Sequence, residues 1–218
     1  MAKPSLHVSL GVLDIDNCIK LATKAFLSGA EVIEISNSLL KKHGIYIISE
    51  IRRVLPKAKI YADTKTIDNI DDEGKIIYEA GADIFSIHAS VDEEEVLNRL
   101  SYIRKLGLEF SLDLTGFKDV LSKVLSISYL TPDYFYYKIP ENISKNISNH
   151  PEIFRIIKDL VRISSAPLII AGLNDLQSYS ICARLGVSSL SIPIDEKNIN
   201  NIEELVKEFK KAIEISFP

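Results

Sequence analysis

The chain has 218 residues, 46% of them hydrophobic and 26% charged, which suits one compact domain and leaves little room for a second. Its formal net charge of −4, without a basic stripe, argues against nucleic acid or a membrane surface as partner and favours a small-molecule ligand. The residues after Met1 lack the basic start and apolar core of a signal peptide. No apolar run reaches the roughly 18 residues of a membrane span, so we expect a cytoplasmic protein.

A junction between helix and strand recurs four times along the chain. In each copy a helical pattern ends in glycine, a short pair of residues follows, and a β-branched, apolar run begins. Glycine is favoured directly after a helix because it adopts the left-handed backbone conformation without steric cost. The copies are SGAEVIEI (28–35), AGADIFSI (80–87), LGLEFSL (106–112) and LGVSSLSI (185–192).

Apolar runs of strand length alternate with helical patterns throughout the chain. Strands are predicted at residues 6–12, 32–35, 60–63, 84–87, 109–112, 134–137, 167–171 and 188–192. Helices are predicted at residues 17–28, 39–55, 71–80, 93–106, 118–128, 151–164, 175–185 and 202–215. Parallel neighbours need a crossover helix, and eight repeats can close a sheet, so the pattern predicts a single (β/α)8 TIM barrel over residues 1–218. An open doubly wound sheet is the alternative, although no GxGxxG follows the first strand.

The segment 139–150, IPENISKNISNH, is the least regular part of the chain. It follows the sixth predicted strand, where a functional loop of such a barrel would lie. It is either a mobile lid over the active site or a solvated loop.

The cysteines and most histidines lack metal-ligand spacing. Cys18 and Cys182 fall in separate helical patterns and are expected to be buried apolar residues, without a disulfide. His7, His43 and His150 are likewise isolated in the sequence.

The third predicted strand delivers the densest group of charged residues to the end of the barrel where such folds carry their active sites. Asp63, Lys65 and Asp68 lie within six residues, with Asp63 and Lys65 on the same side of an extended chain. A lysine between carboxylates can stabilise a developing enolate, and the carboxylates can hold a divalent cation. The alternative is an ion-pair cluster that caps the next helix.

Glu34 stands inside the apolar segment VIEIS, where a carboxylate needs a partner or a metal. We expect it to face the barrel interior near Asp63. Two carboxylates from neighbouring strands suit Mg²⁺, which keeps positions open for water and substrate oxygens. An interior salt bridge from Glu34 to Lys65 is the alternative.

Further polar residues end the next three strands. His88 is a candidate proton shuttle, or else a hydrogen-bonded wall residue. Asp113, followed by Thr115, is a candidate for the substrate site or a cap of its own loop. Lys138 ends the sixth strand at the barrel mouth.

Five segments in order, VSLG, VIEISNSL, ADTKTID, AGADIFSIH and LDLTG, resemble the orotidine monophosphate decarboxylase superfamily. The superfamily pattern D-x-K-x-x-D is present as Asp63, Lys65 and Asp68, and the resemblance extends over roughly the first 140 residues. The glutamate at position 34 resembles hexulose-phosphate synthases and ketogulonate-phosphate decarboxylases, whereas orotidine monophosphate decarboxylases carry a lysine there. His88 resembles the latter enzymes.

The resemblance implies a set of roles for these residues. Glu34 and Asp63 would bind Mg²⁺, which holds the enediolate of a sugar phosphate, while Lys65 supports the negative charge. Asp68 would reach into the active site of the partner subunit of a homodimer.

The sequence also departs from the family pattern. Gly11 stands where the first strand carries an aspartate, and Lys138 stands at the position of the catalytic acid/base histidine. A lysine there could transfer protons only if its pKa fell towards neutrality.

The phosphate-binding loops depart as well. They read AGLND (171–175) and SIPIDE (191–196), so that Gly172 and Asn174 remain candidates for substrate binding while Leu173 replaces the second glycine. Pro193 offers no N–H, and acidic Asp195 and Glu196 follow it.

These features predict a divergent Mg²⁺-dependent lyase of the hexulose-phosphate synthase type, which performs aldol or retro-aldol chemistry on a ketose phosphate through an enediolate. One alternative is orotidine 5'-monophosphate decarboxylation. Another is a non-catalytic barrel that serves as a binding or regulatory subunit.

Overall fold

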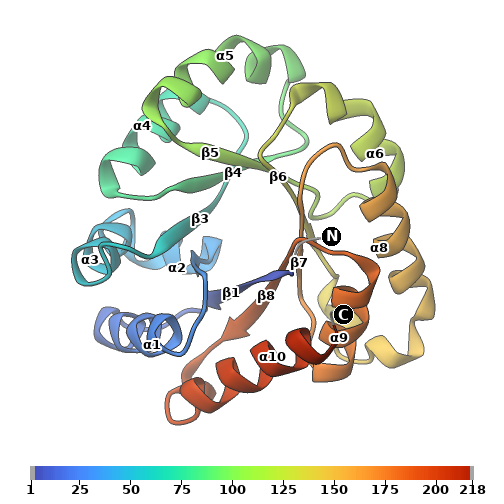
Figure 1. The fold of residues 1–218 in the computed structure, drawn as a ribbon. Helices are drawn as coiled ribbons and strands as arrows, with labels where there is room; N and C mark the ends of the chain where they lie inside the picture. Colours follow the sequence, from blue (N-terminus) through green and yellow to red (C-terminus); the bar gives the residue numbers. More distant parts are fainter. Residues whose placement is uncertain (1–2, 217–218) are drawn as a thin grey trace.

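The computed structural model describes residues 3–216 and shows eight parallel strands closed into a barrel, in the order β1-β2-β3-β4-β5-β6-β7-β8 with β8 paired to β1 (Figure 1). The strands are β1 (Ser5–Leu10), β2 (Val32–Ile35), β3 (Lys59–Thr66), β4 (Ile84–His88), β5 (Glu109–Asp113), β6 (Tyr134–Lys138), β7 (Leu168–Ala171) and β8 (Ser189–Ile194). The predicted (β/α)8 barrel is therefore confirmed, and the open sheet is excluded.

Helices surround the barrel on its outside (Figure 1). They are α1 (Ile15–Leu27), α2 (Asn37–His43), α3 (Tyr46–Val54), α4 (Ile70–Ala80), α5 (Glu93–Leu106), α6 (Val120–Ile127), α7 (Glu141–Ser144), α8 (Pro151–Ile163), α9 (Leu176–Leu185) and α10 (Ile202–Ser216). Short 3₁₀ helices lie at η1 (Ser128–Leu130), η2 (Ile147–Asn149) and η3 (Glu196–Asn198). Within residues 3–216, no helix is both long enough and apolar enough to cross a membrane.

Two regions differ from the sequence prediction. The helix expected at 39–55 is two helices, because Gly44 ends α2 with φ of 64° and its N–H bonds to the carbonyl of Leu40. The irregular segment 139–150 contains the short helices α7 and η2. Its role as a lid stays a prediction.

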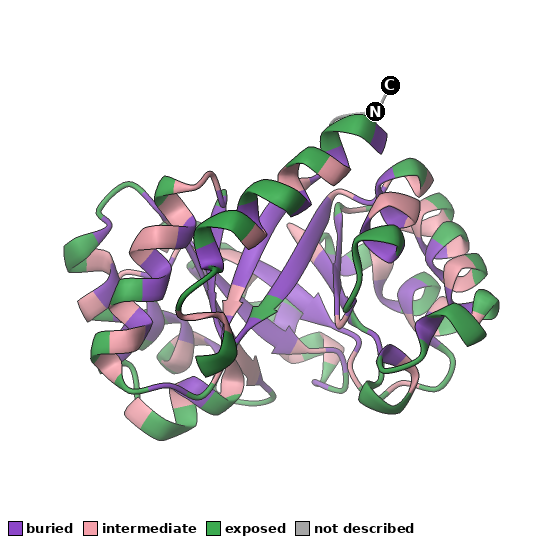
Figure 2. Ribbon diagram, turned by 90° about the horizontal axis from the view of Figure 1, so that it is seen from below, coloured by how far each residue is buried: buried purple, intermediate pink, exposed green. Residues whose placement is uncertain are grey.

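The core has two parts, because strand residues alternate between the helices outside and the barrel interior within. The outer part is the larger one and packs strand residues such as Val8, Ile33 and Phe85 under the helices, where Cys18 and Cys182 are also buried as free thiols. Figure 2 shows the buried strands inside a shell of helices whose outer faces are exposed. The predicted burial of both cysteines is confirmed.

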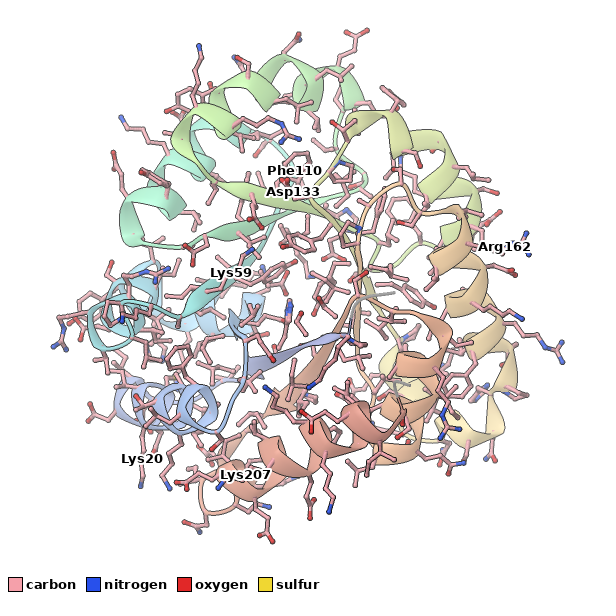
Figure 3. The ribbon with its side chains drawn as sticks, in the orientation of Figure 1. Lys20, Lys59, Phe110, Asp133, Arg162 and Lys207 are labelled. Carbon is pink, nitrogen blue, oxygen red and sulfur yellow. The ribbon has the colours of Figure 1, made fainter. Side chains whose placement is uncertain are left out.

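The outer helix faces carry the charged side chains. Lys20 on α1, Arg162 on α8 and Lys207 on α10 are exposed and point outward in Figure 3. Lys59 at the start of β3 is different, because it pairs with Glu109 of β5 at 2.7 Å. This pair lies at the amino ends of the strands, opposite the end where strand termini deliver the candidate site.

The barrel interior holds a small apolar cluster and an unusual number of polar groups. The apolar cluster consists of Val32, Tyr61, Ile84, Tyr136, Ile169 and Ala171. Buried polar side chains of the barrel strands are His7, Glu34, Asp63, Thr66, Ser86, Ser111, Asp113, Ser189 and Ser191. Burying a polar group is costly unless it is hydrogen-bonded, so each of these residues needs a partner, and together they indicate a candidate site in the barrel.

Candidate active site

A cavity of about 70 Å³ opens at the carboxyl ends of the strands. It is lined by Ser9, Glu34, Ser36, Asp63, Tyr136, Lys138, Ala171, Gly172, Ser191 and Pro193. Of the residues predicted from sequence, Glu34, Asp63, Lys138 and Gly172 therefore share one cavity. The carboxyl ends of barrel strands are where enzymes of this fold carry their active sites.

Glu34 is held by hydroxyl groups from three other strands. Its side chain is 2% exposed. Oε1 accepts hydrogen bonds from Ser9 Oγ at 2.8 Å and Tyr136 Oη at 2.9 Å, and Oε2 accepts one from Ser191 Oγ at 2.9 Å. The carboxylate is thus fixed in orientation by hydroxyl groups.

The ionisation state of Glu34 follows from the same contacts. Burial raises the pKa of its carboxyl, but the facing His7 ring, 3.9 Å from Oε2, and the hydroxyl donors outweigh burial and bring the pKa below its ordinary value. The alternative interpretation, a salt bridge from Glu34 to Lys65, is not among the ion pairs of residues 3–216. Glu34 is therefore an ionised carboxylate at the cavity wall.

Asp63, Thr64 and Lys65 form a bulge in β3. Ala62 pairs with Phe85 and Thr66 pairs with Ile87, so three residues of β3 stand opposite Ser86 alone. Lys65 has a left-handed backbone with φ of 53°, which is uncommon outside glycine.

Ser86 stabilises this bulge. Its Oγ accepts from the backbone N of Lys65 at 2.8 Å and donates to Asp63 Oδ1 at 3.0 Å. Its carbonyl accepts from Thr64 Oγ1 at 2.7 Å. The prediction of an extended chain at Lys65 is wrong, because the bulge, and not strand alternation, aims this side chain.

Lys65 joins two buried carboxylates from different strands. Its Nζ lies 3.1 Å from Asp63 Oδ1 and also contacts Asp113 Oδ2. Asp113 is fully buried and accepts a hydrogen bond from the backbone N of Thr115 at 2.7 Å, so it caps its loop and binds the lysine at once. The cap of its own loop is therefore seen, whereas Asp113 is not among the residues that line the cavity, and its role in substrate binding stays a prediction.

The local charges shift both ionisable partners. Burial raises the pKa of Asp63, and the neighbouring Glu34 and Asp113 add to this, so that it stays above its ordinary value although Lys65 opposes it. For Lys65, burial lowers the pKa, but Asp63 and Asp113 outweigh burial and raise it. Lys65 is thus an ammonium group, and Asp63 takes up a proton more readily than an ordinary aspartate does.

His88 lies apart from this cavity. Its Nε2 lies 2.9 Å from the carbonyl oxygen of Thr115, its Nδ1 lies 2.7 Å from Ser90 Oγ, and its ring stacks on Phe117. Both ring nitrogens therefore contact residues of neighbouring loops, which favours a hydrogen-bonded structural residue over a proton shuttle.

Of the three remaining predicted residues, Asp68 and Asn174 lie outside the Glu34 cavity, whereas Lys138 lines it. Asp68 is exposed after β3, and α4 begins behind Asn69 without a side-chain cap bond, so the helix-capping alternative is not seen. Asn174 donates to Ser144 Oγ at 2.6 Å and lines a separate cavity. Lys138 is exposed at the edge of the Glu34 cavity.

Sequence reasoning missed the hydroxyl groups that hold Glu34. Ser9, Tyr136 and Ser191 carry no motif. Strand alternation could have found Tyr136, because it stands two residues before Lys138 and so faces the same interior. Ser9 pairs with Glu34 across the β1–β2 ladder, a register that sequence alone does not give.

The donor set at the cavity fits Mg²⁺. Glu34 and Asp63 present carboxylate oxygens to one cavity. Among the described residues, Asp63 Oδ2 accepts a single long hydrogen bond, of 3.4 Å, from the backbone N of Asn37. Mg²⁺ commonly uses one or two carboxylates and keeps water or substrate oxygens as its other ligands. Within residues 3–216 no cluster of three or more metal-ligating side chains occurs, so a closed protein cage is not formed.

The fold and cavity define a (β/α)8 barrel with carboxylates and a lysine converging at the catalytic end, the arrangement of an enzyme active site. The sequence matches the model of the Orotidine 5'-phosphate decarboxylase / HUMPS family over residues 4–144, and the chain belongs to that family.

Curated relatives with this likeness are enzymes. The chain is 26% identical over 167 residues to the 3-hexulose-6-phosphate synthase of Bacillus subtilis, which covers 77% of this chain and 78% of that protein. It is 30% identical over 130 residues to the bifunctional enzyme Fae/Hps of Methanoculleus marisnigri, covering 60% of this chain. The match spans 33% of the length of that bifunctional protein.

Solved structures share the fold over the whole chain. A ligand complex of KGPDC from Streptococcus mutans has a TM-score of 0.87 at 16% identity and covers 100% of both chains. The 3-hexulose-6-phosphate synthase from Salmonella typhimurium has a TM-score of 0.85 at 16% identity, covering 97% of this chain and 99% of that one. At these identities the likeness shows the fold alone.

Proposed function

We propose that the protein is a lyase of the hexulose-phosphate synthase type, which forms or breaks a carbon–carbon bond of a ketose phosphate through an enediolate. The observation that carries the proposal is the Lys65 ammonium, bound by Asp63 and Asp113 beside the cavity that Glu34 lines. Family membership and the named relatives support the same reaction class.

Lys65 stabilises negative charge in this proposal. An enediolate forms when a proton passes from the carbon next to a ketose carbonyl to a base, for which the carboxylates at the cavity are available, and the substrate oxygens then carry the charge. A fixed, partly buried ammonium beside the cavity lowers the energy of that state without reorganising. Because its pKa is raised, Lys65 acts as a positive charge and not as a neutral base.

Mg²⁺ bound by Glu34 and Asp63 would supply a Lewis acid for the oxygens of the substrate. The His7 ring and the hydroxyl groups of Ser9 and Ser191 keep the pKa of Glu34 low, so that it is ionised. These two hydroxyl groups and that of Tyr136 orient the carboxylate for this role. Asp63 is oriented by Ser86 and by Lys65.

Deuterium exchange at C1 of ribulose 5-phosphate, followed by NMR with and without Mg²⁺, tests the proposal. We expect Mg²⁺-dependent exchange that Glu34→Gln and Lys65→Ala abolish. Circular dichroism and size-exclusion chromatography of both variants show whether they fold. Absence of exchange in the folded wild type would reject the synthase reaction, and would leave a different ligand or a non-catalytic role.

We also propose a homodimer in which Asp68 reaches the partner's site. An apolar cavity of about 290 Å³ lies between α2 and α4, with Thr64 of β3 also in its lining, and Ile45 and Ile76 of that lining are about half exposed. Ile67, which follows β3, is about half exposed as well. Ile67 adjoins Asp68 in the sequence, so burying this face against a second copy carries Asp68 into the interface.

Mixing two inactive variants tests the shared site. In an equal mixture of Asp68→Ala and Lys65→Met subunits, mixed dimers contain one site with neither change, so activity should return to about a quarter of the wild-type value if subunits exchange freely. Light scattering establishes the dimer. An Ile67→Asp variant should shift it to monomer, and a dimer without recovered activity would show that the sites are independent.

A further inference from the structure

We propose that Lys138 recognises an anionic group of the substrate, and that it does so in place of backbone phosphate loops. This inference rests on the proposed function, because it names how the ligand of the Glu34 cavity is held. Lys138 ends β6 and lines that cavity together with Glu34 and Asp63. This anion-binding role differs from an acid/base role, in which Lys138 would exchange protons with the reacting carbon.

The backbone N–H groups around the end of β8 are already used inside the protein. Gly11 N donates to the carbonyl of Ile194 at 2.7 Å. Asp195 N donates to Asn198 Oδ1 at 3.1 Å, and Lys197 N donates to Asp195 Oδ1 at 2.8 Å. Pro193 has no N–H to offer. These N–H groups are therefore not free to bind an oxyanion, and the proline removes a further donor from the loop.

The glycine after β7 serves packing. Gly172 has φ of 82°, and a Cβ atom at this position would lie 2.8 Å from the carbonyl oxygen of Ile139. The close approach to the main chain that follows β6 explains the glycine without a ligand. It also brings the β7 loop against the residue next to Lys138.

The charges at the cavity are divided between two sides. Glu34 and Asp63 make the β2 and β3 side acidic, while Lys138 stands on β6, next to Ala171 in the β6–β7 ladder. The other ammonium, Lys65, is bound by two carboxylates, whereas in the described residues 3–216 no hydrogen bond or ion pair engages the Lys138 side chain. An unpaired ammonium is the stronger candidate for binding an anion from solution.

The size of the cavity is consistent with this division. At about 70 Å³ it is small beside the roughly 300–1,000 Å³ of ligand pockets, so it accepts only the reacting end of a sugar. The rest of the ligand extends toward solvent past the exposed Lys138. An anionic tail in that position meets the ammonium without displacing any internal contact.

Calorimetric titration with ribulose 5-phosphate and with ribulose tests the assignment, using wild type, Lys138→Met and Lys138→Arg. Lys145→Met is the matched control, because Lys145 is exposed in the segment that follows β6 and pairs with Glu141. We expect Lys138→Met to weaken ribulose 5-phosphate binding roughly tenfold or more while ribulose binding is unchanged. Lys138→Arg should retain most of the affinity, and Lys145→Met all of it.

Three further readouts separate recognition from proton transfer and from failure of the proposed function. Inorganic phosphate should compete with ribulose 5-phosphate in wild type and not in Lys138→Met. In the exchange assay, Lys138→Met should raise KM with little change in kcat, whereas a lost acid/base group lowers kcat at unchanged affinity. If wild type binds ribulose 5-phosphate without deuterium exchange and Lys138→Met loses that binding, the inference stands and the lyase proposal fails.

Two results would overturn the inference. One is equal affinity of wild type and Lys138→Met for ribulose 5-phosphate. The other is a wild type that binds neither ribulose 5-phosphate nor inorganic phosphate, even if it exchanges deuterium with ribulose.

Discussion

Replacing Lys65 by methionine removes the ammonium from between two buried carboxylates while keeping a side chain of similar length. Asp113 is fully buried and Asp63 nearly so, and both contact Lys65 Nζ. Breaking a buried ion pair from one side commonly costs about 3–5 kcal/mol, because the remaining charge is left unpaired. The Lys65 side chain is 25% exposed, so we lower the expected loss to about 2–4 kcal/mol.

The loss depends on pH with a definite sign. Lys65 lowers the pKa of Asp63, so its removal moves that pKa further above the unfolded value. A carboxyl whose folded pKa exceeds its unfolded pKa destabilises the native state increasingly as pH rises through the folded value. The deficit of Lys65→Met should therefore be smallest near the ordinary aspartate pKa of about 3.9 and largest at neutral pH.

Urea unfolding of wild type and variant, followed by circular dichroism at both pH values, measures this difference. At neutral pH the melting temperature should fall by roughly 5–15 °C for a chain of this size. Adding Asp113→Asn to Lys65→Met should recover about 1–3 kcal/mol, because it removes one unpaired charge. A loss within about 0.5 kcal/mol of zero, or one that Asp113→Asn deepens, would refute the reasoning.

Two further substitutions have matched controls in the chain. Tyr136→Phe loses a hydroxyl bond to the buried β2 carboxylate and should cost about 1.5–3 kcal/mol in urea unfolding, whereas Tyr137→Phe, whose hydroxyl has no hydrogen bond within the described residues, should cost far less. Equal losses would show that the bond contributes nothing specific. Gly172→Ala and Gly107→Ala both strain a left-handed backbone, with φ of 82° and 80°, but only the former meets the carbonyl of Ile139. It should cost about 1–3 kcal/mol more than Gly107→Ala in the same measurement, and similar values would contradict the clash.

The barrel could be predicted from sequence because each of its repeats carries a local signal. At two of these junctions, Gly81 and Gly107 adopt a left-handed backbone with φ of 101° and 80°, as the helix-to-strand pattern requires. Those signals fix the order of elements and, through the parallel rule, the closed sheet. They do not fix where a helix breaks, and α2 and α3 are separate although Leu40 and Ile48 continue one apolar pattern across Gly44.

The candidate site was only partly predictable, for a different reason. Glu34, Asp63 and Lys65 stand out because charges inside apolar strands are costly. Their partners do not, since Ser86 and Ser191 are ordinary strand residues until the barrel brings them to the carboxylates. The register between strands that are distant in sequence decides such contacts, and no local pattern encodes it.

The distribution of charge in the barrel interior bears on whether the chain is an enzyme or an inert binding barrel. Glu34, Asp63 and Asp113 are buried carboxylates, and the Lys65 ammonium pairs with only two of them. Apolar residues of similar volume would often stabilise such positions by about 1–4 kcal/mol, so this arrangement is costly for a barrel that needs only to fold. The excess negative charge lies at the cavity, where a cation or an ionisable substrate can offset it. On physical grounds the interior therefore favours a catalytic site over an inert scaffold.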